Sequence, residues 1–163
     1  MKLSATTYTY NGKAKKPGVT VTDANGNTLS RSSYSVSYGR DSKSAGRHTV
    51  KITLKGNYRG TMKRSYTIHP RATSVSKLSK KSKGFTVKVK KLSAATATGY
   101  QVQYSLNSSF KGAKTKTISG TSLTVKRLKG NKKYYVRVRT YKKSGSKKYY
   151  SSWSGAKTVK TRR

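Results

Sequence analysis

Apolar and polar residues alternate along short stretches of this 163-residue chain. A period of two places successive side chains on opposite faces of a β-strand, so each stretch can bury one apolar face while Lys, Arg, Thr and Gln face water. Helical periodicity, with apolar residues three and four positions apart, is missing throughout. The clearest predicted strands cover residues 34–38, 48–54, 85–89, 100–104, 123–125 and 134–139.

Turns rich in asparagine and glycine separate these stretches at short intervals. Both residue types tolerate the positive φ angles that tight hairpins require. Many short strands at such spacing are typical of β-sandwiches rather than of helical or α/β folds. The predicted turns are centred on Asn11-Gly12, Asn25-Gly26, Gly56-Asn57, Gly130-Asn131 and Gly145.

The charge of the chain is extreme. Thirty-nine Lys and Arg residues are opposed only by Asp23 and Asp41, which gives a net charge of +37 without a single Glu. Low hydrophobicity with high net charge is typical of disordered chains, but 13 Tyr residues and the regular alternation favour a folded protein. A compact domain of this charge repels itself unless salt or an anionic partner screens it. We therefore predict that the folded chain lies beside a polyanion.

The segment His69-Pro70-Arg71 is the predicted boundary between two modules. A predicted strand ends just before it, and Pro70 cannot continue a hydrogen-bonded ladder. Residues 1–70 hold 13 basic residues and both Asp residues, a net +11, whereas residues 71–163 hold 26 basic residues and no acid, a net +26. The chain is therefore predicted to be all-β, with two tandem β-sandwich modules over residues 1–70 and 71–163.

Residues 71–163 resemble a fibronectin type III domain over nearly their whole length. The resemblance is carried by residues 84–89, 99–104, 122–128, 129–139, 153–154 and 157–160. Leu128 and Tyr134 have the spacing of a tyrosine corner, in which the tyrosine hydroxyl bonds the backbone near the preceding turn. The resemblance implies structural roles for Leu128, Tyr134 and Trp153. It also implies a lighter core, because Val89 stands where family members usually carry Trp.

Residues 1–70 are similar to bacterial immunoglobulin-like repeats through residues 8–17, 34–38 and 55–60. Such tandem modules resemble those near the ends of large surface proteins of Gram-positive gut anaerobes, where they serve mainly as spacers or binding surfaces. This implies a secreted or cell-surface location. No apolar signal segment follows Met1, so we expect the chain to be part of a longer exported protein. We expect no membrane span, because no stretch approaches the roughly 20 apolar residues that one needs.

The chain offers few side chains for catalysis or metal binding. Asp23 lies in a predicted turn, where Asp caps its own backbone, and Asp41 lies in a predicted loop. His48 begins a predicted strand, His69 lies at the module junction, and there is no Cys. Enzymes of ordinary design need positioned acids, bases or nucleophiles, so we expect no catalytic residue, no metal, no cofactor and no enzymatic activity.

The basic side chains of the second module form the predicted binding surface. Period two places Arg137 and Arg139 on an outer face beside Tyr135, with Gln101 and Gln103 on the neighbouring strand. Such a surface can hydrogen-bond phosphates or sugars, and an exposed Tyr135 can stack on a ligand ring. The predicted polyanion-binding residues are Lys88, Lys90, Lys126, Arg127, Lys129, Lys132, Lys133, Arg137, Arg139, Lys142, Lys143, Lys147 and Lys148.

The leading hypothesis is a monomeric, non-catalytic spacer that is anchored electrostatically to an anionic cell-wall polymer such as teichoic acid, or to an acidic glycan. Lysines that merely guard sheet edges would not require removing every acid from the 93 residues after position 70. One alternative is nonspecific nucleic-acid binding, although no recognition helix or zinc-finger spacing is present. Two others are adhesion to a host glycan through loops at 105–114 and 141–150, and an accessory segment of a larger exported enzyme.

Overall fold

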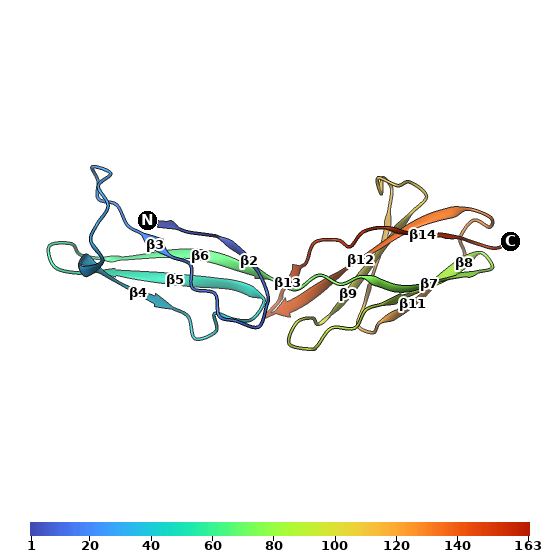
Figure 1. The fold of residues 1–163 in the computed structure, drawn as a ribbon, viewed down its shortest axis with the longest axis horizontal. Coiled ribbons are helices and arrows are strands. Elements are labelled where there is room, and N and C mark those ends of the chain that lie inside the picture. The colour runs from blue at the N-terminus through green and yellow to red at the C-terminus, as the bar shows by residue number, and fades with distance from the viewer. The chain divides into compact units, whose positions relative to one another are not determined.

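The computed structural model describes all 163 residues, and strands form nearly all of its regular structure (Figure 1). The chain divides into two compact units, Met1–His69 and Pro70–Arg163. The predicted all-β class is confirmed, since the only helical element is the 3-10 turn η1 (Arg31–Ser33). The structure contains no helix with the length and hydrophobicity that a membrane crossing requires.

The first unit is built on one four-stranded sheet in the order β2-β6-β5-β4, accompanied by the β1–β3 pair. Strand β2 runs parallel to β6, whereas the other neighbours are antiparallel. The alternation predicted for residues 48–54 buries Val50 and Ile52 completely, and Tyr66 and Ile68 from β6 pack with them. The strands are β1 (Lys2–Leu3), β2 (Thr7–Thr9), β3 (Val19–Thr20), β4 (Tyr34–Tyr38), β5 (Gly46–Leu54) and β6 (Thr61–His69).

The second unit has two sheets, in the orders β10-β9-β12-β13, with β14 beside β12, and β11-β8-β7. Their inner faces supply one core that includes Phe85, Val87, Val102 and Val136, all fully buried. Phe85 meets the ring of Tyr104 edge-on, with 5.6 Å between centroids. The strands are β7 (Val75–Lys81), β8 (Gly84–Val89), β9 (Gly99–Ser105), β10 (Lys114–Ile118), β11 (Ser122–Val125), β12 (Lys133–Ser144), β13 (Lys147–Tyr150) and β14 (Lys157–Lys160).

The tyrosine corner predicted from the spacing of Leu128 and Tyr134 is present. The Lys129 backbone N–H donates to the Tyr134 hydroxyl oxygen at 3.2 Å. Tyr134 is buried, and the half-buried Leu128 packs against the same core. The hydroxyl therefore satisfies a backbone donor at the turn between β11 and β12 and fixes that end of the sandwich.

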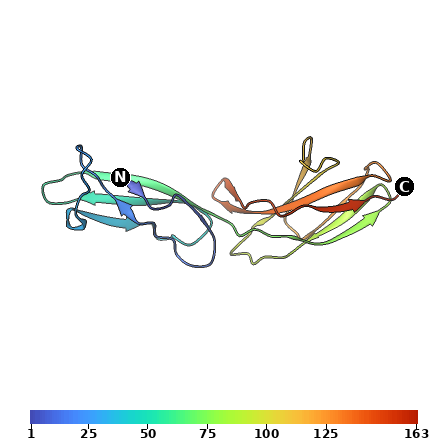
Figure 2. The same cartoon turned by 45° about the horizontal axis from the view of Figure 1, so that its top comes forward.

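The end of the second unit differs from the sequence prediction. Residues 141–150, predicted as a loop, form a hairpin in which β13 pairs with the last four residues of β12. The predicted last strand is also interrupted, because β14 pairs only with the opposite end of β12, over Lys133–Val136. Strand β12 runs the length of the unit in both ribbon views (Figures 1 and 2), so it carries both partners.

Two serines bridge the gap between β13 and β14. The Ser151 hydroxyl accepts the Thr140 backbone N–H at 3.0 Å, and the Ser154 hydroxyl accepts the Val138 N–H at 3.0 Å. Their own backbone N–H groups donate to the Thr140 and Val138 carbonyls. Serine side chains thus replace two backbone acceptors of the ladder. The backbone N–H groups of β12 keep hydrogen-bond partners while the intervening segment bulges outward.

Candidate polyanion-binding surface

Strand β12 carries the arginines that the sequence predicted for polyanion binding. Its valines point into the core, whereas Arg137 and Arg139 lie half-buried on the outer face. Pairing with β9 sets Gln103 opposite Arg137 and Gln101 opposite Arg139. The structure therefore places these four side chains on one face, as the alternation predicted.

The two arginines are held by the glutamines beside them. Arg137 Nε donates to Gln103 Oε1 at 2.7 Å, and Arg139 Nε donates to Gln101 Oε1 at 2.9 Å. Each glutamine amide then donates to a threonine hydroxyl of β10, at 3.1 Å from Gln103 and 3.2 Å from Gln101. A guanidinium fixed in this way loses less freedom when it meets an anion than one on a mobile side chain.

Aromatic rings cover both guanidinium groups. Arg137 lies 4.0 Å from the Phe110 ring centre and 4.9 Å from that of Trp153. Arg139 lies 4.3 Å from the Trp153 ring centre and 4.1 Å from that of Tyr150. We call this alternating stack of Phe110, Arg137, Trp153, Arg139 and Tyr150 the arginine ladder. Each such contact contributes about 0.5–1 kcal/mol at exposed sites.

The arginine ladder adds to the predicted outer face a feature that the alternation did not predict, because aromatic rings cover both arginines. Burial lowers the pKa of Arg139 from its ordinary value, although an arginine still stays charged at neutral pH. Tyr135, predicted to be exposed, is half-buried with the Lys133 ammonium 5.3 Å from its ring centre. Trp153, predicted as a structural residue, acts outside the core by covering the two arginines.

The predicted lysines fall into three places on the second unit. Lys88 and Lys90 project from β8 and the residue after it, on the sheet opposite the arginine ladder. The end of the unit around residues 126–133 carries Lys126, Arg127, Lys129, Lys132 and Lys133, all exposed. The hairpin at the other end of β12 carries Lys142, Lys143, Lys147 and Lys148.

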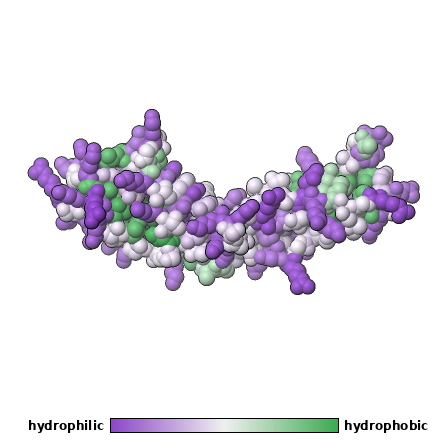
Figure 3. Space-filling view, turned by 180° about the vertical axis from the view of Figure 1, so that it is seen from behind, coloured by the Kyte–Doolittle hydropathy of each residue, from purple (hydrophilic) through white to green (hydrophobic).

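These basic ends are far apart along the unit. At about 3.3 Å of rise per residue, the 12 residues of β12 separate them by roughly 35 Å. Two of the hairpin lysines have internal contacts: Lys142 Nζ donates to the Ala94 carbonyl at 2.6 Å, and Lys148 Nζ lies 5.1 Å from the Tyr141 ring centre. On the face drawn in Figure 3, hydrophilic side chains dominate and apolar ones form separate patches. The surface suits a long ligand more than a small one.

The two acidic residues lie in the first unit and cap turns. Asp23 Oδ1 accepts the backbone N–H groups of Asn25 and Asn27, each at 2.9 Å. Asp41 Oδ1 accepts the N–H groups of Lys43 and Ser44, again at 2.9 Å. These backbone donors lower the pKa of both carboxyl groups.

The histidines are also placed by the fold of the first unit. His48 stacks on Tyr66, with ring centroids 5.3 Å apart, and its Nε2 lies 2.8 Å from the Ser44 carbonyl oxygen. His69 ends β6. No three residues of the His, Cys, Asp and Glu types come together as a metal site would need. The geometry gives these side chains structural contacts.

Comparison with known proteins assigns both halves of the chain. Residues 69–155 match the profile of the fibronectin type III domain, and residues 13–69 match that of the bacterial Ig-like domain (group 3). These matches confirm the predicted tandem of module types. No curated protein sequence matches the chain significantly.

Solved structures show the same kind of fold. The FN1–FN3 domains of chicken contactin (CNTN1) align at a TM-score of 0.52 and 16% identity, covering 74% of this chain and 44% of the contactin chain. A stretch of titin domains aligns at a TM-score of 0.44 and 16% identity, covering 98% of this chain and 62% of that chain. The chain thus spans less than two thirds of either structure. The similarity to contactin supports the β-sandwich fold and nothing finer.

Proposed function

Because the chain belongs to the fibronectin type III domain family and carries a bacterial Ig-like module before that domain, we propose that it is a spacer in a secreted or cell-surface bacterial protein and an electrostatic anchor to anionic polymers. Domains of both families are typically non-catalytic adhesion or spacer modules and are common in extracellular proteins. The observation that carries the anchor role is the charge of the second module. Its 26 basic side chains face no acidic side chain within residues 71–163.

The distribution of these charges favours a polymer as the partner. Single exposed ion pairs contribute only about 0–1 kcal/mol, so useful affinity requires many contacts at once. The exposed lysines at the two ends of β12 supply such contacts over a long surface. The two guanidinium groups of the arginine ladder, although covered by rings, add their positive charge to the field between these ends. A wall teichoic acid or an acidic glycan offers many anions along one chain.

Nucleic acid is the competing polyanion. One route to sequence-specific readout of B-DNA is a helix in the major groove, and the only helical element here is a three-residue turn in the first unit. Cations alone still attract any phosphate backbone, with an affinity that falls steeply as salt rises. Nucleic-acid binding is therefore expected to be nonspecific and secondary.

A binding panel tests the proposal. The intact chain is titrated with purified wall teichoic acid, heparin, duplex DNA and a neutral glycan across a salt series from about 0.05 to 1 M, where the screening length falls from more than 10 Å to about 3 Å. The expected result is multivalent binding to the acidic polymers that disappears at high salt. Retention that persists unchanged at molar salt, or equal affinity for the neutral glycan, would contradict the anchor role.

Charge-reversal variants locate the surface. K147E/K148E changes two exposed lysines of the β12–β13 hairpin in the basic unit. K51E/K63E is the matched control, because Lys51 and Lys63 are exposed cross-strand neighbours in the first unit and the net charge changes equally. The first variant should weaken polymer binding severalfold more than the second. Equal losses would mean that only total charge matters.

A further inference from the structure

The second unit has an open side where both of its sheets end. Strand β10 pairs only with β9, and β11 pairs only with β8, so each is an edge strand. Both strands border one groove, since Lys114 and Lys116 of β10 line it together with Leu123 and Val125 of β11. The interior of the sandwich is therefore accessible along this edge.

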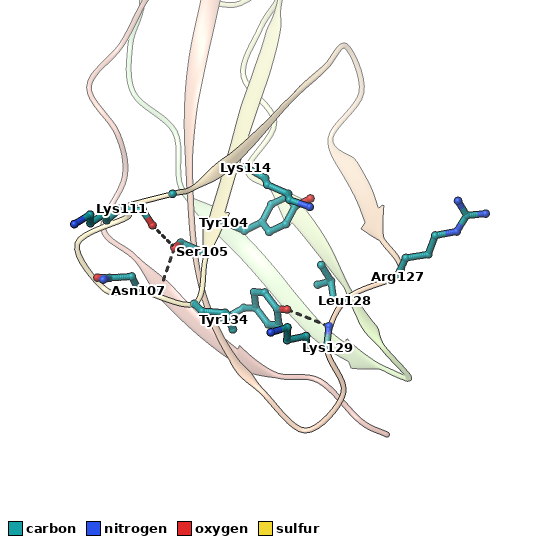
Figure 4. A pocket seen from close by; sticks show the side chains of 11 residues that line it. Tyr104, Ser105, Asn107, Lys111, Lys114, Arg127, Leu128, Lys129 and Tyr134 are labelled. Carbon is teal, nitrogen blue, oxygen red and sulfur yellow. Dashed lines mark hydrogen bonds between the residues drawn. The ribbon is translucent and has the colours of Figure 1, made fainter.

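The groove consists of two adjoining hollows of about 450 and 340 Å³. They share Tyr104, Lys114, Arg127 and Leu128. Figure 4 shows the larger hollow, with the side chains of Tyr104, Leu128 and Tyr134 between the strands and Lys114 beside Tyr104, while the side chains of Lys111 and Arg127 point outward. Volumes in this range are typical of small-molecule sites.

The floor of the groove is apolar. Leu123 and Leu128 are partly buried against the core of the unit. Leu106 is 47% exposed, which makes it one of the two large apolar side chains that the chain leaves exposed, and it lines the larger hollow. A solvent-facing leucine beside an accessible core gives an apolar ligand a surface from which it would displace water.

The cationic side chains of the groove and the Tyr104 hydroxyl can donate hydrogen bonds to a ligand, whereas the side chains of Ser105, Asn107 and Tyr134 already bond within the protein. Tyr104 is only 5% exposed and lines both hollows, and its hydroxyl makes no side-chain hydrogen bond within the protein. The hydroxyl faces the solvent of the groove, because no buried side-chain oxygen of the structure lacks a partner. Burial raises the pKa of Tyr104, so the hydroxyl keeps its proton. Lys114 pairs with Tyr104 across the strands, so the two side chains lie on the same, inner face of the sheet.

Cations also line the rim. Lys111, Lys116, Arg127 and Lys129 surround the two hollows, and the unit contains no acidic side chain that could neutralise them. Inward-pointing lysines on an edge strand also prevent two copies from pairing edge to edge. That role accounts for the charge of β10, and Leu123 and Leu128 also pack against the core, but neither role explains why Leu106 stays exposed beside them.

From this geometry we propose that the groove between β10 and β11 binds an organic anion with an apolar body. The Tyr104 hydroxyl and the Lys114 ammonium receive the carboxylate or phosphate, and the aliphatic or aromatic body lies against Leu106, Leu123 and Leu128. A second copy of the chain is excluded as the occupant because the like charges repel. A wholly hydrophilic polymer is excluded because it would leave the apolar floor unfilled.

The site goes beyond the anchor role, which requires only charge, and it is tested by following backbone amide NMR signals of the intact chain. The probes are phenyl phosphate, inorganic phosphate and phenol at a salt concentration of about 0.15 M. Phenyl phosphate should shift the amide signals of Leu106, Lys114 and Leu128 at millimolar or lower concentration. Phosphate and phenol should each bind roughly tenfold more weakly, because each lacks one half of the ligand.

Three conservative variants separate the contributions. Tyr104→Phe removes only the hydroxyl and should weaken phenyl phosphate roughly tenfold, since a hydrogen bond to a charged group contributes more than a neutral one. Lys114→Met keeps an unbranched apolar stem and should cost a similar factor. Lys77→Met removes the same charge from an exposed position of the other sheet, outside both the groove and the predicted polyanion-binding set, and it should change the affinity less than twofold.

Each result decides the proposal. Equal binding of inorganic phosphate and phenyl phosphate would overturn it, as would equal losses in Lys77→Met and Lys114→Met, since both would reduce the site to general attraction by the basic field. Absence of any shift around Leu106 would also overturn it. Retention on teichoic acid in the same variants reports separately on the anchor role, so either function can fail alone.

Discussion

The two units solve the same folding problem with different side chains. In the first unit, carboxylates cap the turns at Asp23 and Asp41. In the second unit, neutral groups do this work: the Ser105 hydroxyl accepts the Asn107 N–H at 3.0 Å, and the Asn107 side chain accepts the Ser109 N–H at 2.8 Å. A β-sandwich can therefore lose every acidic side chain without losing its turn caps. Net charge is free to vary with function while the fold stays the same.

The largest expected effect on stability comes from a core substitution that is confined to one unit. Phe85→Ala removes a fully buried ring from the second unit and should lower its free energy of unfolding by about 3–5 kcal/mol. Trp153 is the only tryptophan and lies in the second unit, so its fluorescence follows that unit alone.

Methyl NMR signals of Val50 and Ile52 report on the first unit in the same sample. These signals should keep their wild-type unfolding midpoint in Phe85→Ala if the two cores are independent. The two cores have no residue in common, which favours independence. A simultaneous loss of both cores would show that the units fold as one, and the comparison of two separate modules would then fail.

A smaller effect is expected from the arginine ladder. Trp153→Ala removes the ring shared by Arg137 and Arg139 and should destabilise the second unit by about 1–2 kcal/mol, from two contacts of about 0.5–1 kcal/mol each. Trp153→Phe should restore part of the loss, because a phenyl ring keeps a weaker cation–π contact. Urea unfolding followed by circular dichroism measures both. No change in Trp153→Ala would mean that the stack contributes nothing in water.

The alternation of residues was enough to predict most of the fold. Strands β5, β8 and β9 lie where the pattern expected them, and the spacing from Leu128 to Tyr134 predicted the tyrosine corner. These features depend on local period and short spacing. The serine bridge at Ser151 and Ser154 was not predicted. It requires serine hydroxyls to replace backbone acceptors, and the alternation of apolar and polar residues carries no information about such a replacement.

The arginine ladder and the groove were missed for a related reason. The ladder combines Phe110 from a loop, Arg137 from β12 and Trp153 from the bulged segment, so it depends on tertiary placement. The groove depends on which strands end each sheet, a matter of topology. The orientation of Arg137 with Gln103 needed only alternation, and it was predictable.

Added salt should stabilise the two units to different extents, because their net charges differ. The second unit carries +26 and the first +11, so self-repulsion destabilises the second more. Raising NaCl from about 0.02 to 0.3 M shortens the screening length from roughly 20 Å to roughly 6 Å. The unfolding midpoint of the second unit should rise by more than that of the first, as followed by Trp153 fluorescence and by the Ile52 methyl signal. Equal rises would indicate a general salt effect.

The smallest expected effect is the loss of stability in acid. Here the first unit, and not the second, should respond more. The folded-state pKa values of Asp23 and Asp41 are lowered by backbone donors. Groups with a depressed folded pKa stabilise the folded state above the unfolded value of about 3.8–3.9, and they lose that contribution as pH falls through the lower folded value. The first unit should therefore lose a little stability between about pH 5 and pH 2.

The second unit has no acidic side chain to protonate, so its unfolding midpoint should stay constant over the same range at fixed ionic strength. Asp41→Asn provides the control, because an amide keeps an oxygen acceptor for the Lys43 and Ser44 N–H groups but has no carboxyl proton to gain. In that variant the acid dependence of the first unit should shrink toward the contribution of Asp23. An equal fall in both units would mean that acid acts through overall positive charge, since only the first unit contains titrating caps.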